Sequence, residues 1–151
     1  QWRGTNNTVW RNVTPSFVWK ALNNISLSLD NGGQTTRDFI YVEDIVDGLI
    51  ACAENGVPGG VYNLASGKET TIKELAEKIL QLTNSQSTLE LLPKRDWDNS
   101  GRRYGETDKS EKEIGFKCKI DIDEGLKKTV EWTIEHKELI SNCINKHNYY
   151  M

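Results

Sequence analysis

The fold is decided by residues 33–45, which read GQTTRDFIYVEDI. A turn ends at Gly33, a short β-prone run covers residues 39–42, and the apolar stripe of an amphipathic helix starts at Ile45. This order predicts a strand that leads directly into a helix, with Arg37 as a lone cation where the turn meets the strand. A guanidinium held there is suited to clamp a phosphate, because its planar fork matches phosphate oxygens.

The rest of the chain continues the alternation of strands and helices. Thr71 and Glu74 have the spacing of a capping box, and Gly115 is placed to end a short helix. Apolar periodicity predicts further strands at 25–29, 61–65 and 88–92, and helices at 14–22, 45–55, 71–80 and 108–114, with a last helix after Asp121 or Asp123. This order predicts an α/β fold.

Composition limits the function classes. The 151 residues carry a formal net charge of −3, which argues against a general nucleic-acid or membrane surface. The three cysteines lack close pair spacing, so we expect neither a disulfide framework nor a CxxC metal site, and a reducing cytoplasm fits best. The polar opening at Gln1, without methionine, is typical of a piece of a longer protein.

Arginines are the strongest candidates for a binding role. Arg37, Arg95 and the pair Arg102-Arg103 all fall in predicted loops or at element ends. Such guanidinium groups suit the oxygens of a diphosphate, and binding residues are often carried on loops. The alternative is that each arginine forms an ordinary surface ion pair with a neighbouring carboxylate, which contributes little stability. The spacing alone leaves both interpretations open.

A set of ordered motifs adds a resemblance. The motifs are TRDFIYVED at 36–44, VYNLAS at 61–66, DKS at 108–110, EIGF at 113–116 and DEGLKKTVEW at 123–132. Together they resemble the extended short-chain dehydrogenase/reductase family, over residues 12–132. The chain looks like the C-terminal, substrate-binding portion of an NAD-dependent nucleotide-sugar epimerase or dehydratase, similar to UDP-sugar 4-epimerases of bacterial surface-polysaccharide pathways.

The resemblance implies a domain plan and partners. Residues 1–135 would form the substrate-binding portion, in which 37–66 pack on a missing N-terminal Rossmann half, and 136–151 would be the end of the terminal helix and a polar tail. The parent enzyme would be a cytoplasmic homodimer that binds a nucleotide-diphosphate sugar, with neither nucleic acid nor membrane as a partner.

The resemblance also implies roles for particular residues. Arg37 and Arg95 would contact the diphosphate, and Asp98 would lie near the ribose hydroxyls. The backbone at Ser28 and Leu29, with Asp30 beside it, would meet the nucleobase. The remaining substrate-binding candidates are Arg102 or Arg103, as a second arginine pair, and Asn12, near the sugar.

The chain departs from the family where catalysis is concerned. A dinucleotide fold needs a glycine-rich turn from strand to helix, and the sequence has no such motif and no Tyr-x-x-x-Lys. We therefore expect NAD in the parent enzyme, none bound by this chain alone, and neither catalytic residues nor a metal site. The alternative is a non-catalytic module that binds nucleotide sugars or a protein.

Overall fold

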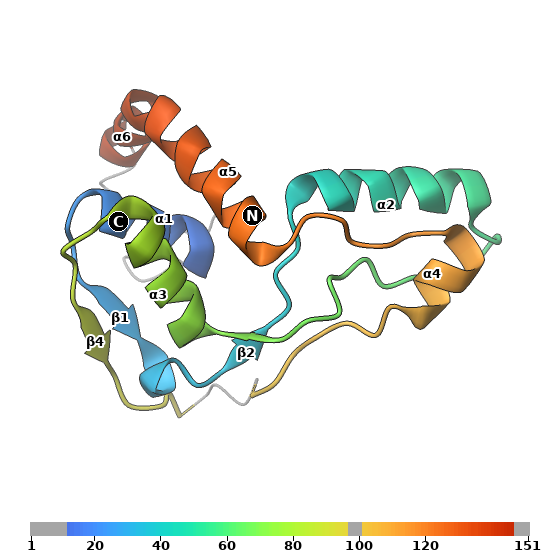
Figure 1. Ribbon diagram of the computed structural model, residues 1–151, viewed down its shortest axis with the longest axis horizontal. Coiled ribbons are helices and arrows are strands. Elements are labelled where there is room, and N and C mark those ends of the chain that lie inside the picture. The colour runs from blue at the N-terminus through green and yellow to red at the C-terminus, as the bar shows by residue number, and fades with distance from the viewer. Residues whose placement is uncertain (1–11, 97–100, 147–151) are drawn as a thin grey trace.

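The computed structural model describes residues 12–96 and 101–146, which form a main body and a long arm (Figure 1). Helices α1, α3 and α5 and strands β1 and β4 make the body, whereas α2 and α4 lie along the arm. In chain order the elements are α1 (Val13–Leu22), β1 (Leu27–Leu29), the 3-10 helix η1 (Asp30–Gly33), β2 (Thr36–Arg37), α2 (Val42–Asn55), β3 (Thr70–Thr71), α3 (Ile72–Thr83), β4 (Leu89–Leu91), α4 (Asp108–Ile114), α5 (Ile122–Glu135) and α6 (Lys137–Lys146).

One apolar core holds the body together. Leu27 and Leu29 on β1 are fully buried, and Leu75 and Ile79 project from α3 into the same cluster. Helix α3 begins as the capping box predicts, because the Thr71 hydroxyl accepts the N–H of Glu74 at 3.0 Å. Apolar residues three and four positions apart then cover β1 and face α1 and α5.

The strands of the described residues form two small sheets. Strand β1 pairs with β4 in parallel, with Leu27 opposite Leu89, and β2 pairs with β3 antiparallel, with Thr36 opposite Thr71. Beyond β1, η1 turns the chain through Asn31 and Gly32, both at positive φ. These pairings confirm an α/β chain with short strands.

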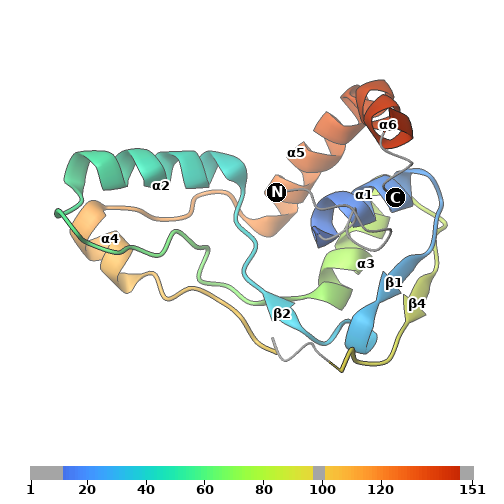
Figure 2. The same cartoon turned by 180° about the vertical axis from the view of Figure 1, so that it is seen from behind.

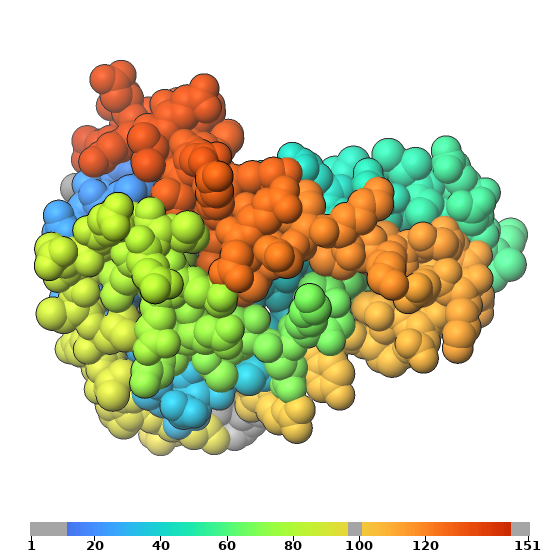
Figure 3. Space-filling view, in the orientation of Figure 1, coloured from blue at the N-terminus to red at the C-terminus, as the bar shows by residue number. Residues whose placement is uncertain are grey.

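The arm has a covered side and an exposed side. Gly48 of α2 is buried, and a Cβ there would lie 2.7 Å from the Leu64 side chain and 2.9 Å from Phe116, so this side packs closely. The other side of α2 carries apolar residues that are about half exposed: Val42 61%, Val46 49%, Leu49 58% and Ile50 51%. Figure 3 shows the arm projecting from the body.

Several local predictions need correction. The runs 39–42 and 61–65 are not strands in the described structure, because no neighbouring segment pairs with them and a strand depends on such a partner. Helix α1 begins two residues earlier than its proline suggested, with Asn12 at the N-cap. After α5 ends at Glu135 a separate helix, α6, follows. None of the helices in the described ranges is long and apolar enough to cross a bilayer.

Leu75→Ala should lower the free energy of unfolding by about 2–5 kcal/mol, because the buried side chain leaves a cavity between three helices. Leu82→Ala, on the same helix but 38% exposed, should cost about 1 kcal/mol or less. Urea denaturation of both variants measures the difference. Equal losses would contradict the position of the core.

Candidate functional site

The first part of the candidate site lies where η1 meets the chain after β4. The N–H groups of Asn31 and Gly32 donate to the carbonyls of Pro93 and Leu92 at 3.3 and 3.1 Å. This backbone contact brings Arg95 to η1, where its guanidinium lies 2.6 Å from a carboxylate oxygen of Asp30. Two predicted site residues therefore touch, and the pair is open to solvent, with Arg95 51% exposed at its side chain.

The second part surrounds β2. The Thr36 N–H donates to the Gly101 carbonyl at 3.2 Å, and the Arg103 N–H donates to the Thr36 hydroxyl at 3.3 Å. Arg102 holds the Glu69 carboxylate with a bidentate contact, in which its Nε lies 3.0 and 3.1 Å from the two oxygens. The Arg102 guanidinium, and then the Thr36 hydroxyl, hold the pKa of Glu69 below its ordinary value.

Arg37 sits between two anchored neighbours. Its Nη1 donates to the Thr36 carbonyl at 2.6 Å. On the other side, the Asp38 carboxylate accepts the Ser66 N–H at 2.8 Å and hydroxyl at 2.6 Å, the Gly67 N–H at 2.9 Å and the Gly105 N–H at 3.2 Å. The three segments 36–38, 66–69 and 101–105 are thereby fixed around the backbone that carries Arg37.

The other predicted site residues are placed as follows. The Ser28 hydroxyl donates to Glu90 on the neighbouring strand at 2.9 Å. Leu29 is buried, and its carbonyl accepts the Leu92 N–H at 3.0 Å as the parallel pairing continues. Asn12 precedes α1 as its N-cap. Asp98 lies outside the described residues.

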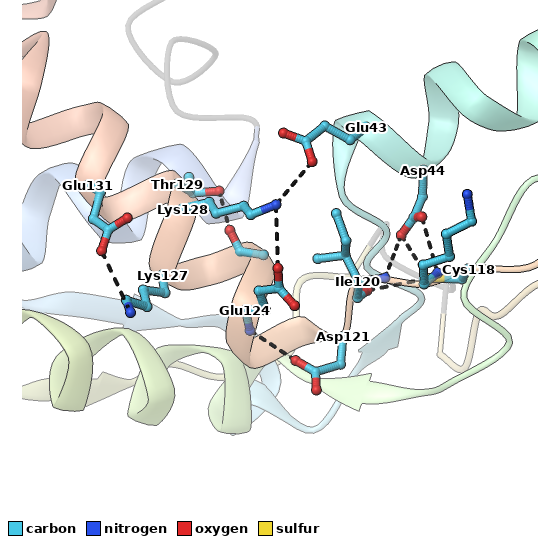
Figure 4. A network of polar contacts seen from close by, with 12 residues as sticks. Glu43, Asp44, Cys118, Ile120, Asp121, Glu124, Lys127, Lys128, Thr129 and Glu131 are labelled. Atoms are coloured by element: carbon cyan, nitrogen blue, oxygen red, sulfur yellow. Dashed lines mark hydrogen bonds and ion pairs between the residues drawn. The ribbon is translucent and has the colours of Figure 1, made fainter.

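A further carboxylate, which is buried, ties the arm to the body (Figure 4). Asp44, at 2% exposure, accepts the N–H groups of Ile120 at 2.9 Å and Lys119 at 3.1 Å, and the Cys118 thiol at 3.2 Å. Burial acts against its charge, but these donors outweigh burial and lower the pKa of Asp44. Beside it, the ammonium of Lys128 on α5 bridges Glu43 at 3.0 Å and Glu124 at 3.4 Å.

The same contacts exclude Cys118 as a nucleophile at neutral pH. Burial, and then the Asp44 carboxylate, raise the pKa of the Cys118 thiol to about 11. The thiolate is the reactive form, so this thiol stays protonated and inert. Within the described ranges no cluster of three His, Cys, Asp or Glu side chains could hold a metal ion.

The small cavity between the body and the arm does not suit a nucleotide. It measures about 80 Å³ and lies between Phe39, Tyr41 and the start of α5. Ligand pockets for molecules of that size usually exceed about 300 Å³. A wider hollow of about 570 Å³ lies along α3, and its lining, which includes Glu74, Glu77 and Lys78, contains no arginine. The candidate site is the open, arginine-bearing edge formed by η1, β2 and the segments 92–95 and 101–103 (Figure 2).

Sequence reasoning found the arginines of this edge but missed the residues that organise it. Asp38 and Glu69 act on partners about 30 positions away or more, and Asp44 looked like an ordinary carboxylate in the first turn of a helix. The available signal was an acidic residue directly beside a candidate arginine, as at Arg37-Asp38.

Comparisons with known proteins agree with this architecture. The family model described as GDP-mannose 4,6 dehydratase matches residues 2–129. The structure of the Bordetella bronchiseptica enzyme WbmF with NADH is 54% identical, with a TM-score of 0.87, and its complex with NAD+ and UDP is 52% identical, with a TM-score of 0.86. Each match covers 99% of this chain and 44% of that one. Human dTDP-D-glucose 4,6-dehydratase is 30% identical over 129 residues, which are 82% of this chain and 37% of the relative.

These matches contradict the narrower prediction of a C-terminal portion of a UDP-sugar 4-epimerase-like enzyme. The matching family model and the human relative are dehydratases by description, and a solved UDP-glucose 4-epimerase from Thermotoga maritima is only 25% identical. The chain spans less than half the length of these relatives, and the matches support a family fragment without establishing it as the C-terminal half.

Asp44→Asn should lower the free energy of unfolding by about 1.5–3 kcal/mol at neutral pH, the typical contribution of hydrogen bonds to a charged group. The folded-state pKa lies below the ordinary value of 3.8, so the carboxylate stabilises the fold above that pH. This contribution is lost as the pH falls through the lower folded-state pKa.

The difference in the free energy of unfolding between the wild type and Asp44→Asn should therefore become smaller as the pH falls. Urea denaturation at several pH values measures it. Asp47→Asn is the matched control, because Asp47 pairs with Lys119 at the surface and should change stability by at most about 1 kcal/mol. A difference that stays constant with pH would contradict the role of the Asp44 charge.

Proposed function

We infer that this chain, which belongs to the GDP-mannose 4,6-dehydratase family of NAD-dependent nucleotide-sugar dehydratases and epimerases, binds the diphosphate of a nucleotide sugar. The observation that carries this proposal is an open edge with two adjoining parts: Arg95 lies at η1, and contacts between distant segments hold the backbone of Arg103 and the side chain of Arg102 around β2, which carries Arg37. Several guanidinium groups on fixed loops suit the oxygens of a diphosphate.

The ion pairs of this edge do not oppose the proposal. Arg95 pairs with Asp30 and Arg102 with Glu69, and both arginine side chains are more than half exposed. Exposed pairs of this kind contribute only about 0–1 kcal/mol, so a diphosphate can replace or share them. The ordinary surface pairs that the sequence left as an alternative are thus compatible with binding.

We propose uridine diphosphate as the nucleotide part of the ligand. WbmF, which is 52% identical to this chain, was crystallised with UDP. In this proposal Arg37 and Arg95 bind the diphosphate, the β1 end at Ser28–Asp30 meets the base, and Asp98 binds the ribose. Asn12 lies near the sugar, and Arg102 or Arg103 adds a further phosphate contact.

Catalysis belongs to a larger assembly in this proposal. WbmF was crystallised with NAD+ and with NADH, but the residues of this chain do not fit that cofactor: the sequence has no glycine-rich strand-to-helix turn and no Tyr-x-x-x-Lys. The chain supplies substrate recognition to a cytoplasmic, dimeric epimerase or dehydratase, for which bacterial surface-polysaccharide synthesis is the proposed setting.

The exposed face of α2 supports a docking role for residues 37–66. Four apolar side chains about half exposed on one helix face are unusual for a surface that stays in water. Relatives such as WbmF are more than twice as long as the matched part. We propose that this segment packs against the part of the family fold that the chain does not cover.

Arg37→Ala and Arg95→Ala should each weaken UDP binding about tenfold, because each removes a charge-assisted hydrogen bond to phosphate. Uridine, which lacks the phosphates, should bind both variants like the wild type. Calorimetric titration of the chain with UDP and with uridine measures this. Lys117→Ala, on the arm, removes the same charge and should leave binding unchanged; equal weakening in all three variants would contradict the site.

Leu49→Gln combined with Ile50→Gln should reduce self-association of the isolated chain, because uncovered apolar faces associate in water. Sedimentation velocity over a range of concentrations measures the effect, and circular dichroism checks that α2 remains helical. Lys73→Gln with Glu77→Gln on α3 is the control, since it adds the same residues and keeps the net charge. An identical concentration dependence in all three proteins would contradict docking through this face.

A further inference from the structure

Glu69 connects β2, the strand that carries Arg37, with the 101–103 loop. It lies directly before β3, and its side chain is 22% exposed. One carboxylate oxygen accepts the Thr36 hydroxyl at 2.7 Å, while both oxygens accept the Arg102 Nε–H. The Nη2 of Arg102 completes the bidentate contact. A single carboxylate thus links β2 with the 101–103 loop.

The contacts indicate that Glu69 is anchored independently and that it holds the Arg102 side chain. Glu69 is anchored by Thr36, which is itself tied to the 101–103 loop by two further hydrogen bonds. The Arg102 side chain is 74% exposed, and a long exposed arginine samples many rotamers unless a partner holds it. The carboxylate therefore orders the arginine rather than the reverse.

The geometry leaves Arg102 able to bind an anion while it is held. The pair with Glu69 uses the Nε and Nη2 edge of the guanidinium. The end of the guanidinium, formed by Nη1 and the second N–H of Nη2, still has the fork geometry that matches two phosphate oxygens. An arginine that is ordered beforehand loses less conformational entropy when its ligand binds.

We propose that Glu69 is a positioning residue for the diphosphate: it holds Arg102 beside β2, so that the second edge of the Arg102 guanidinium meets the phosphate. This inference rests on the proposed function, because the ligand is the same diphosphate. The inference adds the acidic residue Glu69 to a cationic site. Glu69 would raise the affinity for the diphosphate indirectly, through Arg102.

The test is a double-mutant cycle read out by UDP and uridine affinity. Glu69→Gln keeps the shape and a hydrogen bond to Thr36 but removes the charge that holds Arg102. It should raise the Kd for UDP about three- to tenfold and leave that for uridine unchanged. In an Arg102→Ala background the same change should have no further effect, because its target is gone. Glu111→Gln, which breaks the exposed pair with Lys117, is the charge control.

Each outcome decides between the claims. Loss of UDP affinity in Glu69→Gln that disappears in the Arg102→Ala background supports positioning. Unchanged or tighter UDP binding by Glu69→Gln overturns the inference alone, and tighter binding would show that the carboxylate competes with phosphate. A loss that persists in the Arg102→Ala background also overturns it, because Glu69 would then act through Thr36. A wild-type chain that binds no UDP overturns the proposed function and this inference together.

Discussion

The arrangement of body, arm and site depends on the hydrogen bonds that the Asp38 carboxylate accepts. It accepts four hydrogen bonds from Ser66, Gly67 and Gly105, so that three segments crossing between body and arm meet at one residue. Charged acceptors make stronger hydrogen bonds than neutral ones, which suits a junction with little apolar cover. Arg37 directly precedes Asp38. The contacts that fix the arm therefore also fix the backbone of Arg37, the residue proposed to bind phosphate.

Buried or half-buried carboxylates take the place of sheet structure in this part of the chain. Asp44 accepts two N–H groups from the segment that leads into α5, and Asp38 accepts those of Ser66, Gly67 and Gly105. In a sheet, such N–H groups would be satisfied by a neighbouring strand. Here acidic side chains satisfy them, which gives the loops defined positions with only two residue pairs between β2 and β3.

The sequence predicted the elements whose signals are local. The Thr71 cap of α3, the Gly115 end of α4 and the Asp121 cap of α5 are confirmed, because each depends on residues within one helical turn. The strands expected at 39–42 and 61–65 are wrong for the described structure, because β-propensity cannot supply a pairing partner. The same distinction applies to the site. Its arginines could be predicted from the sequence because of their residue type, whereas their carboxylate partners depend on tertiary contacts.

The acidic net charge of the chain and its arginine-bearing edge are consistent with each other. A formal charge of −3 disfavours polyanions, which would meet the whole surface, whereas a diphosphate contacts only a few side chains at short range. Interactions between exposed charges are screened beyond about 8 Å at physiological ionic strength, so the local arginines dominate for a small ligand. The pairing of Arg95 with Asp30 and of Arg102 with Glu69 further limits the attraction to ligands that can form directed hydrogen bonds. In the proposed function, the edge therefore selects a compact anion over an extended one.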